Sequence, residues 1–167
     1  MKLKMNNIGI IGQGFVGNAV YQKFKNYYDV YTFDIDKSKC NSSHQTVMSC
    51  EYIFLCLPTP MNKDGSCNTD LIESELKKIV NVSPKGVIIK STVEPGSTER
   101  WNKIYDFDIV FNPEFLTEKS ARLDFINQTR IILGGAKIHT SKVAKLFKER
   151  FKYCHIIQTD FKTSELV

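Results

Sequence analysis

Short apolar runs alternate with segments of helical period along this chain. Runs of strand length occur at residues 7–12, 30–34, 52–57, 86–91, 108–111, 130–134 and 154–158. Between them, apolar positions recur at helical spacing in residues 15–24, 71–80 and 143–151, and each such face can cover a sheet. The alternation predicts an α/β fold, a doubly wound, mostly parallel sheet with helices on both faces.

Two segments fit this pattern less clearly. Residues 37–51 are polar and weakly patterned, which predicts a loop or a short helix. The final TDFKTSELV predicts the start of a helix, with Thr163 as its cap and Glu165 in its first turn. Because 167 residues is about the size of one domain, we expect a single domain over residues 1–167 that is cut rather than finished at its end.

Composition and charge narrow the function classes. Net charge is +5, from 23 basic and 18 acidic residues, but the lysines are scattered, so we expect no nucleic-acid partner. No apolar run is long enough for a membrane span, and the first apolar run is broken by glycines, so we expect neither a membrane partner nor a signal peptide, and a cytoplasmic location. The five cysteines form no CxxC pair and the three histidines have no ligand spacing, so no disulfide scaffold or metal site is expected.

A glycine-rich turn provides the first candidate chemistry. Gly12, Gly14 and Gly17 stand in GQGFVG, after the first predicted strand and at the start of the first predicted helix. Backbone amides of this turn, including those at Phe15 and Val16, and the helix N-terminus can face a pyrophosphate. The context predicts a Rossmann-type dinucleotide site, because a lone GxGxxG is often only a flexible turn.

The end of the second predicted strand supports this reading. VYTFD ends in Asp34, 17 positions after Gly17. A carboxylate there accepts hydrogen bonds from the ribose hydroxyls and repels a 2′-phosphate, which favours NAD over NADP. Lys37 and Lys39 lie close enough in sequence to soften that preference.

Hydroxyl side chains follow the next two predicted strands. The third strand runs into Pro58, Thr59 and Pro60, and the fourth ends at Ser91 and Thr92. The carboxyl ends of parallel strands share one edge of the sheet, where ligands bind. Either threonine alone is an ordinary turn residue, but together they predict hydroxyls that bind the cofactor or a catalytic water.

Two glutamates follow the fifth predicted strand. Pro113 restricts Asn112 to extended backbone, and Glu114 and Glu118 are four apart, so they share a face if the segment is helical. Two readings stay open at this point: a pair of catalytic carboxylates, or negative charges that stabilise a helix N-terminus.

Taken together, these motifs resemble the N-terminal domain of the UDP-glucose and GDP-mannose dehydrogenase family. The matching motifs, in order along the chain, are GQGFVG, the strand-end Asp34, LCLPTP, IKSTVEPGST, FNPEFLTEKSA with RIILGG, and TSELV. The resemblance implies NAD as cofactor and a nucleotide sugar as substrate. It implies a four-electron oxidation of the sugar's primary alcohol to a uronic acid through cysteine-bound intermediates, with UDP-glucose to UDP-glucuronate as the leading expectation.

The resemblance also implies roles for individual residues. Thr59 corresponds to a threonine that contacts the cofactor, and Thr92 to one that holds a water near the reacting carbon. Glu118 corresponds to a general base or water-activating glutamate, and Glu114 to a carboxylate beside the sugar. The backbone segment that would line the nucleotide-sugar pocket is that of Phe115 and Leu116.

The chain departs from the family pattern at two places. The 37–51 connection is shorter than usual, and the family's lysine, asparagine and nucleophilic cysteine follow TSELV, beyond this chain. We therefore expect that the 167 residues bind NAD but turn over a UDP-sugar weakly or not at all, and the candidates for completing the site are a complementing C-terminal half or self-association. The alternatives are a non-catalytic NAD-binding remnant or regulatory module, and another NAD enzyme on the same fold.

Overall fold

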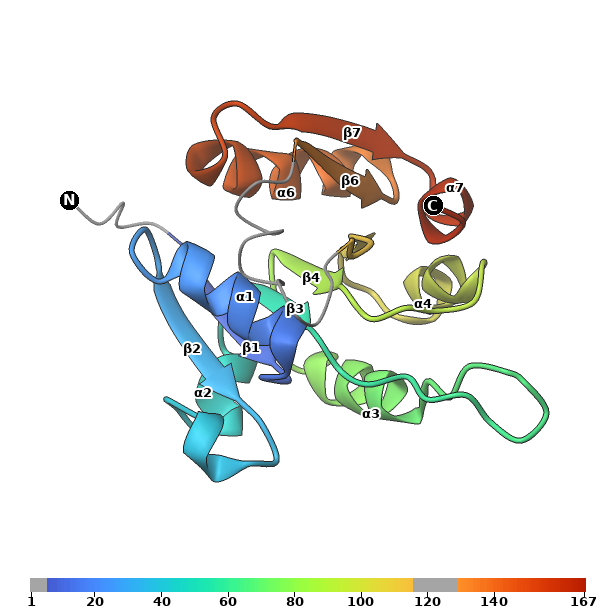
Figure 1. Ribbon diagram of the computed structural model, residues 1–167, viewed down its shortest axis with the longest axis horizontal. Helices are drawn as coiled ribbons and strands as arrows, with labels where there is room; N and C mark the ends of the chain where they lie inside the picture. The colour runs from blue at the N-terminus through green and yellow to red at the C-terminus, as the bar shows by residue number, and fades with distance from the viewer. Residues whose placement is uncertain (1–5, 116–128) are drawn as a thin grey trace.

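The computed structural model describes residues 6–115 and 129–167, and these form one seven-stranded sheet (Figure 1). The strands are β1 (Asn7–Ile11), β2 (Asp29–Phe33), β3 (Tyr52–Leu55), β4 (Gly86–Ile89), β5 (Ile109–Phe111), β6 (Arg130–Gly134) and β7 (His155–Thr159). Each predicted strand is present, with bounds within two residues of the prediction. Their order in the sheet is β2-β1-β3-β4-β5-β6-β7.

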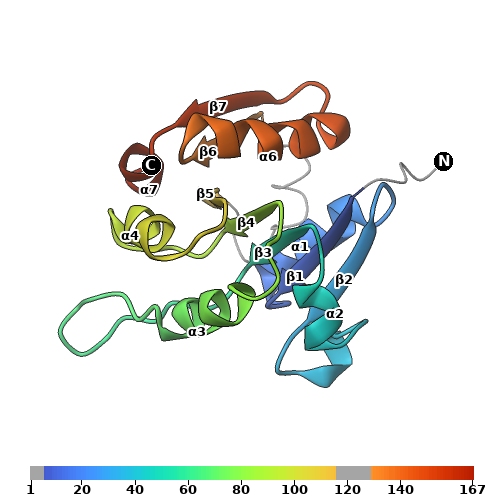
Figure 2. The same cartoon turned by 180° about the vertical axis from the view of Figure 1, so that it is seen from behind.

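The sheet is mostly parallel, as predicted, with one reversal. Strands β1 to β5 pair in parallel, and so do β6 and β7. β6 meets β5 antiparallel, through the single pair Phe111 and Gly134. Figure 2 shows β6 and β7 at one end of the sheet, away from β1 and β2.

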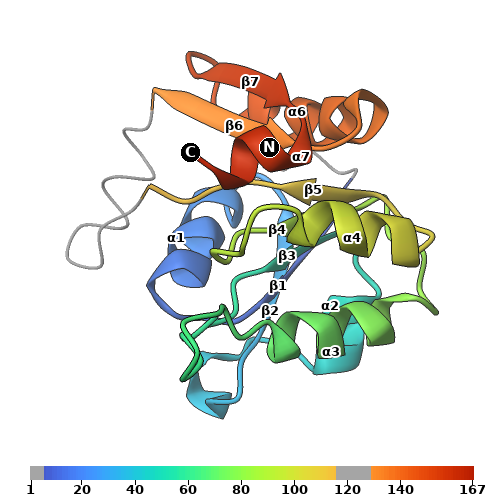
Figure 3. The same ribbon diagram turned by 90° about the vertical axis from the view of Figure 1, so that its right-hand side faces the viewer.

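Helices cover both faces of the sheet (Figure 3). They are α1 (Phe15–Phe24), α2 (His44–Met48), α3 (Asp70–Ile79), α4 (Ser97–Ile104), α6 (Lys137–Arg150) and α7 (Phe161–Glu165), with a short 3-10 helix η1 (Lys37–Lys39). Buried residues of α1 and α6 pack on one face, and buried residues of α2, α3 and α4 on the other. Burial on both faces explains why the central strands β3, β4 and β5 are continuous apolar runs, whereas the edge strands β2 and β7 carry polar residues and are partly exposed.

Aromatic rings join α1 to α6 on the first face. The Phe24 ring centroid lies 5.7 Å from that of Phe147 and 5.8 Å from that of Phe54 on β3, with the rings tilted or edge to face. Such geometries are the favourable ones for aromatic pairs. The cluster fixes α1, and with it the turn that precedes this helix.

Three local expectations changed or sharpened. The polar 37–51 segment holds the two short helices η1 and α2, while α4 was not predicted because its apolar positions are few. The last helix forms, but its cap is Asp160, whose carboxylate accepts from the Thr163 amide at 2.8 Å. The prediction of Thr163 as the cap was therefore wrong, and Glu165 lies at the end of α7 rather than in its first turn.

α7 is also tied to α4. The Glu165 carboxylate accepts hydrogen bonds from the backbone amides of Gly96 and Thr98, at 2.5 and 2.8 Å. These amides belong to the start of α4 and have no partner within that helix, so a carboxylate is well placed there.

Candidate functional site

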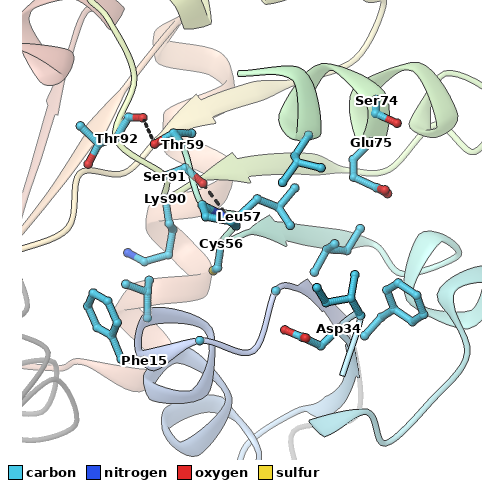
Figure 4. A pocket seen from close by; sticks show the side chains of 18 of the residues that line it. Phe15, Asp34, Cys56, Leu57, Thr59, Ser74, Glu75, Lys90, Ser91 and Thr92 are labelled. Carbon is cyan, nitrogen blue, oxygen red and sulfur yellow. Dashed lines mark hydrogen bonds between the residues drawn. The ribbon is translucent and has the colours of Figure 1, made fainter. Parts of the chain in front are cut away.

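A cavity of about 640 Å³ opens at the carboxyl ends of β1, β3 and β4 (Figure 4). The chain leaves β1 for β2 on one side and returns for β3 on the other, so β1 and β3 flank the switch point where open sheets of this type bind ligands. Eight of the residues proposed from sequence line it: Gly12, Gly14, Phe15, Val16, Asp34, Thr59, Thr92 and Glu114.

Each of the three glycines of the turn is placed differently with respect to the atoms that a side chain would meet. Gly12 has φ +92°, and a Cβ there would lie 2.3 Å from the Cys56 carbonyl oxygen on the neighbouring strand. A Cβ on Gly17 would lie 1.9 Å from the Gly12 carbonyl oxygen, so this residue lets α1 approach the turn. A Cβ on Gly14 would meet nothing within 4 Å, because this residue faces the open cavity.

Asp34 marks one end of the cavity, which we call the Asp34 end, together with Lys39, Glu75 and Lys78. Its carboxylate accepts hydrogen bonds from the backbone amides of Gln13, at 2.6 Å, and Asp36, at 2.9 Å. Two amides thus hold the carboxylate in place beside the glycine turn, while its remaining lone pairs are available to a ligand.

Helix α3 supplies part of the Asp34 end that sequence reasoning missed. Leu71, Ser74, Glu75 and Lys78 line the cavity there. The Glu75 carboxylate lies 2.6 Å from the His44 ring on α2 and 2.7 Å from the Lys78 ammonium. The helical period of 71–80 was visible in the sequence, but not which turn of the helix would face the cavity.

The opposite end of the cavity holds Lys90, Ser91, Thr92 and Glu114, and we call it the Lys90 end. Hydroxyl contacts join the ends of β3 and β4 here, as Figure 4 shows. The Thr59 hydroxyl donates to the Thr92 carbonyl at 2.7 Å, and the Leu57 amide donates to the Ser91 hydroxyl at 3.0 Å. The two threonines are therefore neighbours, as expected from their places at the strand ends, and the Thr92 side chain is exposed.

A buried lysine dominates the Lys90 end, and the sequence analysis did not single it out. The side chain of Lys90 is only 1% exposed, and its ammonium lies 2.7 Å from Glu114 Oε2. It also donates to Asn112 Oδ1 at 2.9 Å, while the Asn112 amide donates to the Ile132 carbonyl on β6 at 2.8 Å. The signal that was available is a lysine that directly continues the apolar strand GVII.

The cysteines near the sheet are poorly suited to act as nucleophiles. Cys56 lines the cavity, and burial raises its pKa to about 12. Burial likewise raises the pKa of Cys50 to about 11 and raises that of Cys154. A thiol must lose its proton to attack, so the raised pKa values make these three thiols poor nucleophiles.

The remaining proposed residues lie at or beyond the edge of the described chain. Leu116 and Glu118 are outside the described residues. Phe115 is half exposed, and the Arg130 guanidinium lies over its ring, 5.5 Å from the centroid. The sequence-based roles of these three residues stay predictions.

Residues 6–115 and 129–167 offer neither a cluster of metal-ligating side chains nor a helix that could span a membrane. No group of three or more histidine, cysteine or acidic side chains is arranged to hold a metal ion. None of the helices in these ranges combines the length and apolar character that crossing a bilayer requires.

The cavity fits a dinucleotide. The left-handed Gly12 and the open face of Gly14 leave room for a pyrophosphate at the N-terminus of α1, where helix amides favour an anion. Asp34 presents a carboxylate at the end of β2, where a ribose would lie. The cavity continues past the glycine turn to the Lys90 end, so the second half of the dinucleotide has space.

Comparisons with known proteins agree with this geometry. An uncharacterized protein of Methanocaldococcus jannaschii is 30% identical over 96% of this chain, which spans 23% of that protein. The UDP-glucose 6-dehydrogenase of Campylobacter jejuni is 32% identical over 84% of the chain, which spans 44% of that enzyme. The chain thus spans less than half of the length of each.

Among solved structures, a UDP-glucose dehydrogenase from Pyrobaculum islandicum superposes with a TM-score of 0.80. Its identity is 21%, and the match covers 97% of this chain and 48% of that one, so it supports the Rossmann-type fold alone. Residues 39–152 match the UDP-glucose/GDP-mannose dehydrogenase family, NAD binding domain, so the cofactor is NAD. The chain therefore belongs to the UDP-glucose/GDP-mannose dehydrogenase family, as a Rossmann-type domain that binds NAD.

Proposed function

We propose that this chain is the N-terminal, NAD-binding domain of a dehydrogenase that oxidises the primary alcohol of a UDP-sugar, and that UDP-glucose is converted to UDP-glucuronate. The observation that carries the proposal is that one continuous cavity joins the glycine turn and Asp34 to Thr59, Thr92 and Glu114. The name of the Campylobacter relative supports UDP-glucose as the substrate.

The chain's own residues divide the work of binding. Amides at the start of α1 hold the pyrophosphate, the Gly12 turn shapes the approach, and Asp34 accepts from the ribose of the adenosine half. Thr59, fixed by its hydrogen bond to the Thr92 carbonyl, contacts the cofactor farther along the cavity. When bound, NAD supplies the hydride acceptor for the oxidation.

Three side chains and the backbone of two further residues are proposed to act near the substrate. The exposed hydroxyl of Thr92 holds a water at the Lys90 end, and Glu114, fixed by Lys90, lies beside the sugar. Glu118 accepts a proton as general base, and the backbone at Phe115 and Leu116 lines the sugar pocket.

The cysteine chemistry of the covalent step is proposed to come from outside these 167 residues. Cys50, Cys56 and Cys154 have raised pKa values and none is an activated thiolate. The purified chain is therefore expected to bind NAD and to form little NADH from a UDP-sugar until a complementing part is supplied, either by a partner or by self-association. Robust NADH formation by the purified chain would refute this part of the proposal.

A chromosomal substitution tests the function in the protein as the cell makes it. Glu118→Gln is expected to remove UDP-glucuronate and raise UDP-glucose in extracts analysed by mass spectrometry. Glu99→Gln, on the exposed side of α4, is the matched control and should leave both pools unchanged. Loss of a different nucleotide uronate would reassign the substrate, and no change in any nucleotide uronate would favour a non-catalytic NAD-binding module.

A further inference from the structure

The Lys90 end contains an ion pair that fold stability does not explain. Lys90 and Glu114 are 1% and 11% exposed at their side chains, with the ammonium 2.7 Å from the carboxylate. Removing two charges from water costs several kcal/mol per ion, and a well-packed apolar pair is often at least as stable. A buried pair in the wall of a binding cavity therefore suggests a role toward the ligand.

The position of the pair identifies the part of the ligand that it faces. Asp34 sets the position of the adenosine half and the glycine turn that of the pyrophosphate. The rest of the cavity, toward β4 and β5, remains for the nicotinamide half. In Figure 4, Lys90 and Thr92 lie across the cavity from Asp34 and Glu75. Among the described lining residues, Lys90 and Glu114 carry the formal charges of this end.

The two redox forms of the cofactor differ in charge at this end. The nicotinamide ring of NAD⁺ is a cation, whereas that of NADH is neutral. A lone carboxylate nearby would therefore favour NAD⁺, and a lone ammonium would disfavour it. Both forms share the same adenosine and pyrophosphate, so the contacts at the Asp34 end do not discriminate between them.

We propose that the Lys90 and Glu114 pair sets the relative affinity of this domain for NAD⁺ and NADH. Lys90 offsets the charge of Glu114, so the paired site favours neither the oxidised nor the reduced cofactor through an uncompensated charge. Asn112, bonded to both Lys90 and the Ile132 carbonyl, keeps the ammonium on the cavity wall. This inference rests on NAD binding and is independent of the sugar that the enzyme oxidises.

The test measures the dissociation constants of NAD⁺ and NADH for the purified 167-residue chain by isothermal titration calorimetry. Glu114→Gln leaves the lysine charge, and is expected to raise the ratio of Kd for NAD⁺ to Kd for NADH by about fivefold or more. Lys90→Met leaves the carboxylate, and is expected to lower this ratio by a similar factor. The double variant should return to within about twofold of the parent, because both charges are gone.

The ratio separates an electrostatic role from a structural one. Damage to the fold weakens the binding of NAD⁺ and NADH together and leaves the ratio of their dissociation constants unchanged. An unchanged ratio in Glu114→Gln would therefore overturn the proposal. Should Lys90→Met not fold, Glu114→Gln and the double variant decide alone. The matched controls are Glu99→Gln and Lys103→Met, which alter an exposed ion pair of 2.8 Å on α4 and should leave the ratio as in the parent.

Discussion

The two ends of the cavity are built by different means. The Asp34 end is built mainly from backbone. The glycine turn sets the shape of the cavity there, and the amides of Gln13 and Asp36 hold the Asp34 carboxylate. The Lys90 end is built from buried side chains, namely the ion pair of Lys90 with Glu114 and the Asn112 amide that links Lys90 to β6. A change in the glycine turn should therefore act through sterics, and a change in the Lys90 and Glu114 pair through a charge that has lost its partner.

The largest effect is expected from Lys90→Met. This change leaves the Glu114 carboxylate buried without its cation, which typically costs about 3–5 kcal/mol of the free energy of unfolding. Urea unfolding followed by the fluorescence of Trp101, the single tryptophan and a buried one, measures it. Adding Glu114→Gln should recover much of the lost stability, because the unpaired charge is then removed. A cost below about 1 kcal/mol for Lys90→Met would show that the Lys90 end does not depend on its ion pair.

The glycine turn allows a matched pair of substitutions. Gly17→Ala places a Cβ 1.9 Å from the Gly12 carbonyl oxygen, so we expect a loss of about 1–3 kcal/mol in the free energy of unfolding. Gly14→Ala meets no atom within 4 Å and should change stability by less than about 0.5 kcal/mol, while it weakens NAD binding by crowding the pyrophosphate. Urea titration and calorimetry of both variants test the pair, and equal destabilisation by the two would contradict it.

A smaller effect is expected from Asp34→Ser. Loss of a charged acceptor should weaken NAD binding by about tenfold, and binding of NADP should weaken less because the carboxylate that repels its phosphate is gone and Lys39 remains. Calorimetry with both cofactors gives the two constants. Asp36→Ser is the control, because Asp36 lies two residues further on and outside the cavity lining; a similar loss there would mean that the effect comes from the loop and not from the ribose contact.

The Asp34 end was largely predictable from sequence because its determinants are local. The spacing of Gly12, Gly14 and Gly17 and the acidic residue at the next strand end follow from the geometry of one βαβ unit. That Thr59 and Thr92 lie next to each other was also anticipated, since parallel strands end at one edge; the Thr59 hydroxyl donates to the Thr92 carbonyl.

The Lys90 end was not predictable in the same way. Lysine is rarely buried, so a lysine after GVII is read as a strand end in solvent, and its partners Asn112 and Glu114 follow more than 20 residues later. The antiparallel direction of β6 was unpredictable for the same reason. An apolar run does not show in which direction its strand will run, and here the direction depends on the pairing of Phe111 with Gly134. Both features exist only once distant segments meet.

The 37–51 connection also protects the rim of the sheet. The Asn41 side chain accepts from the Thr32 amide at 2.7 Å and donates to the Val30 carbonyl at 2.9 Å, so it occupies backbone groups that the edge strand β2 would otherwise leave open. Open strand edges template pairing with other chains and hence aggregation. The Asn41 side chain thus occupies two of the backbone groups through which another chain could pair with β2.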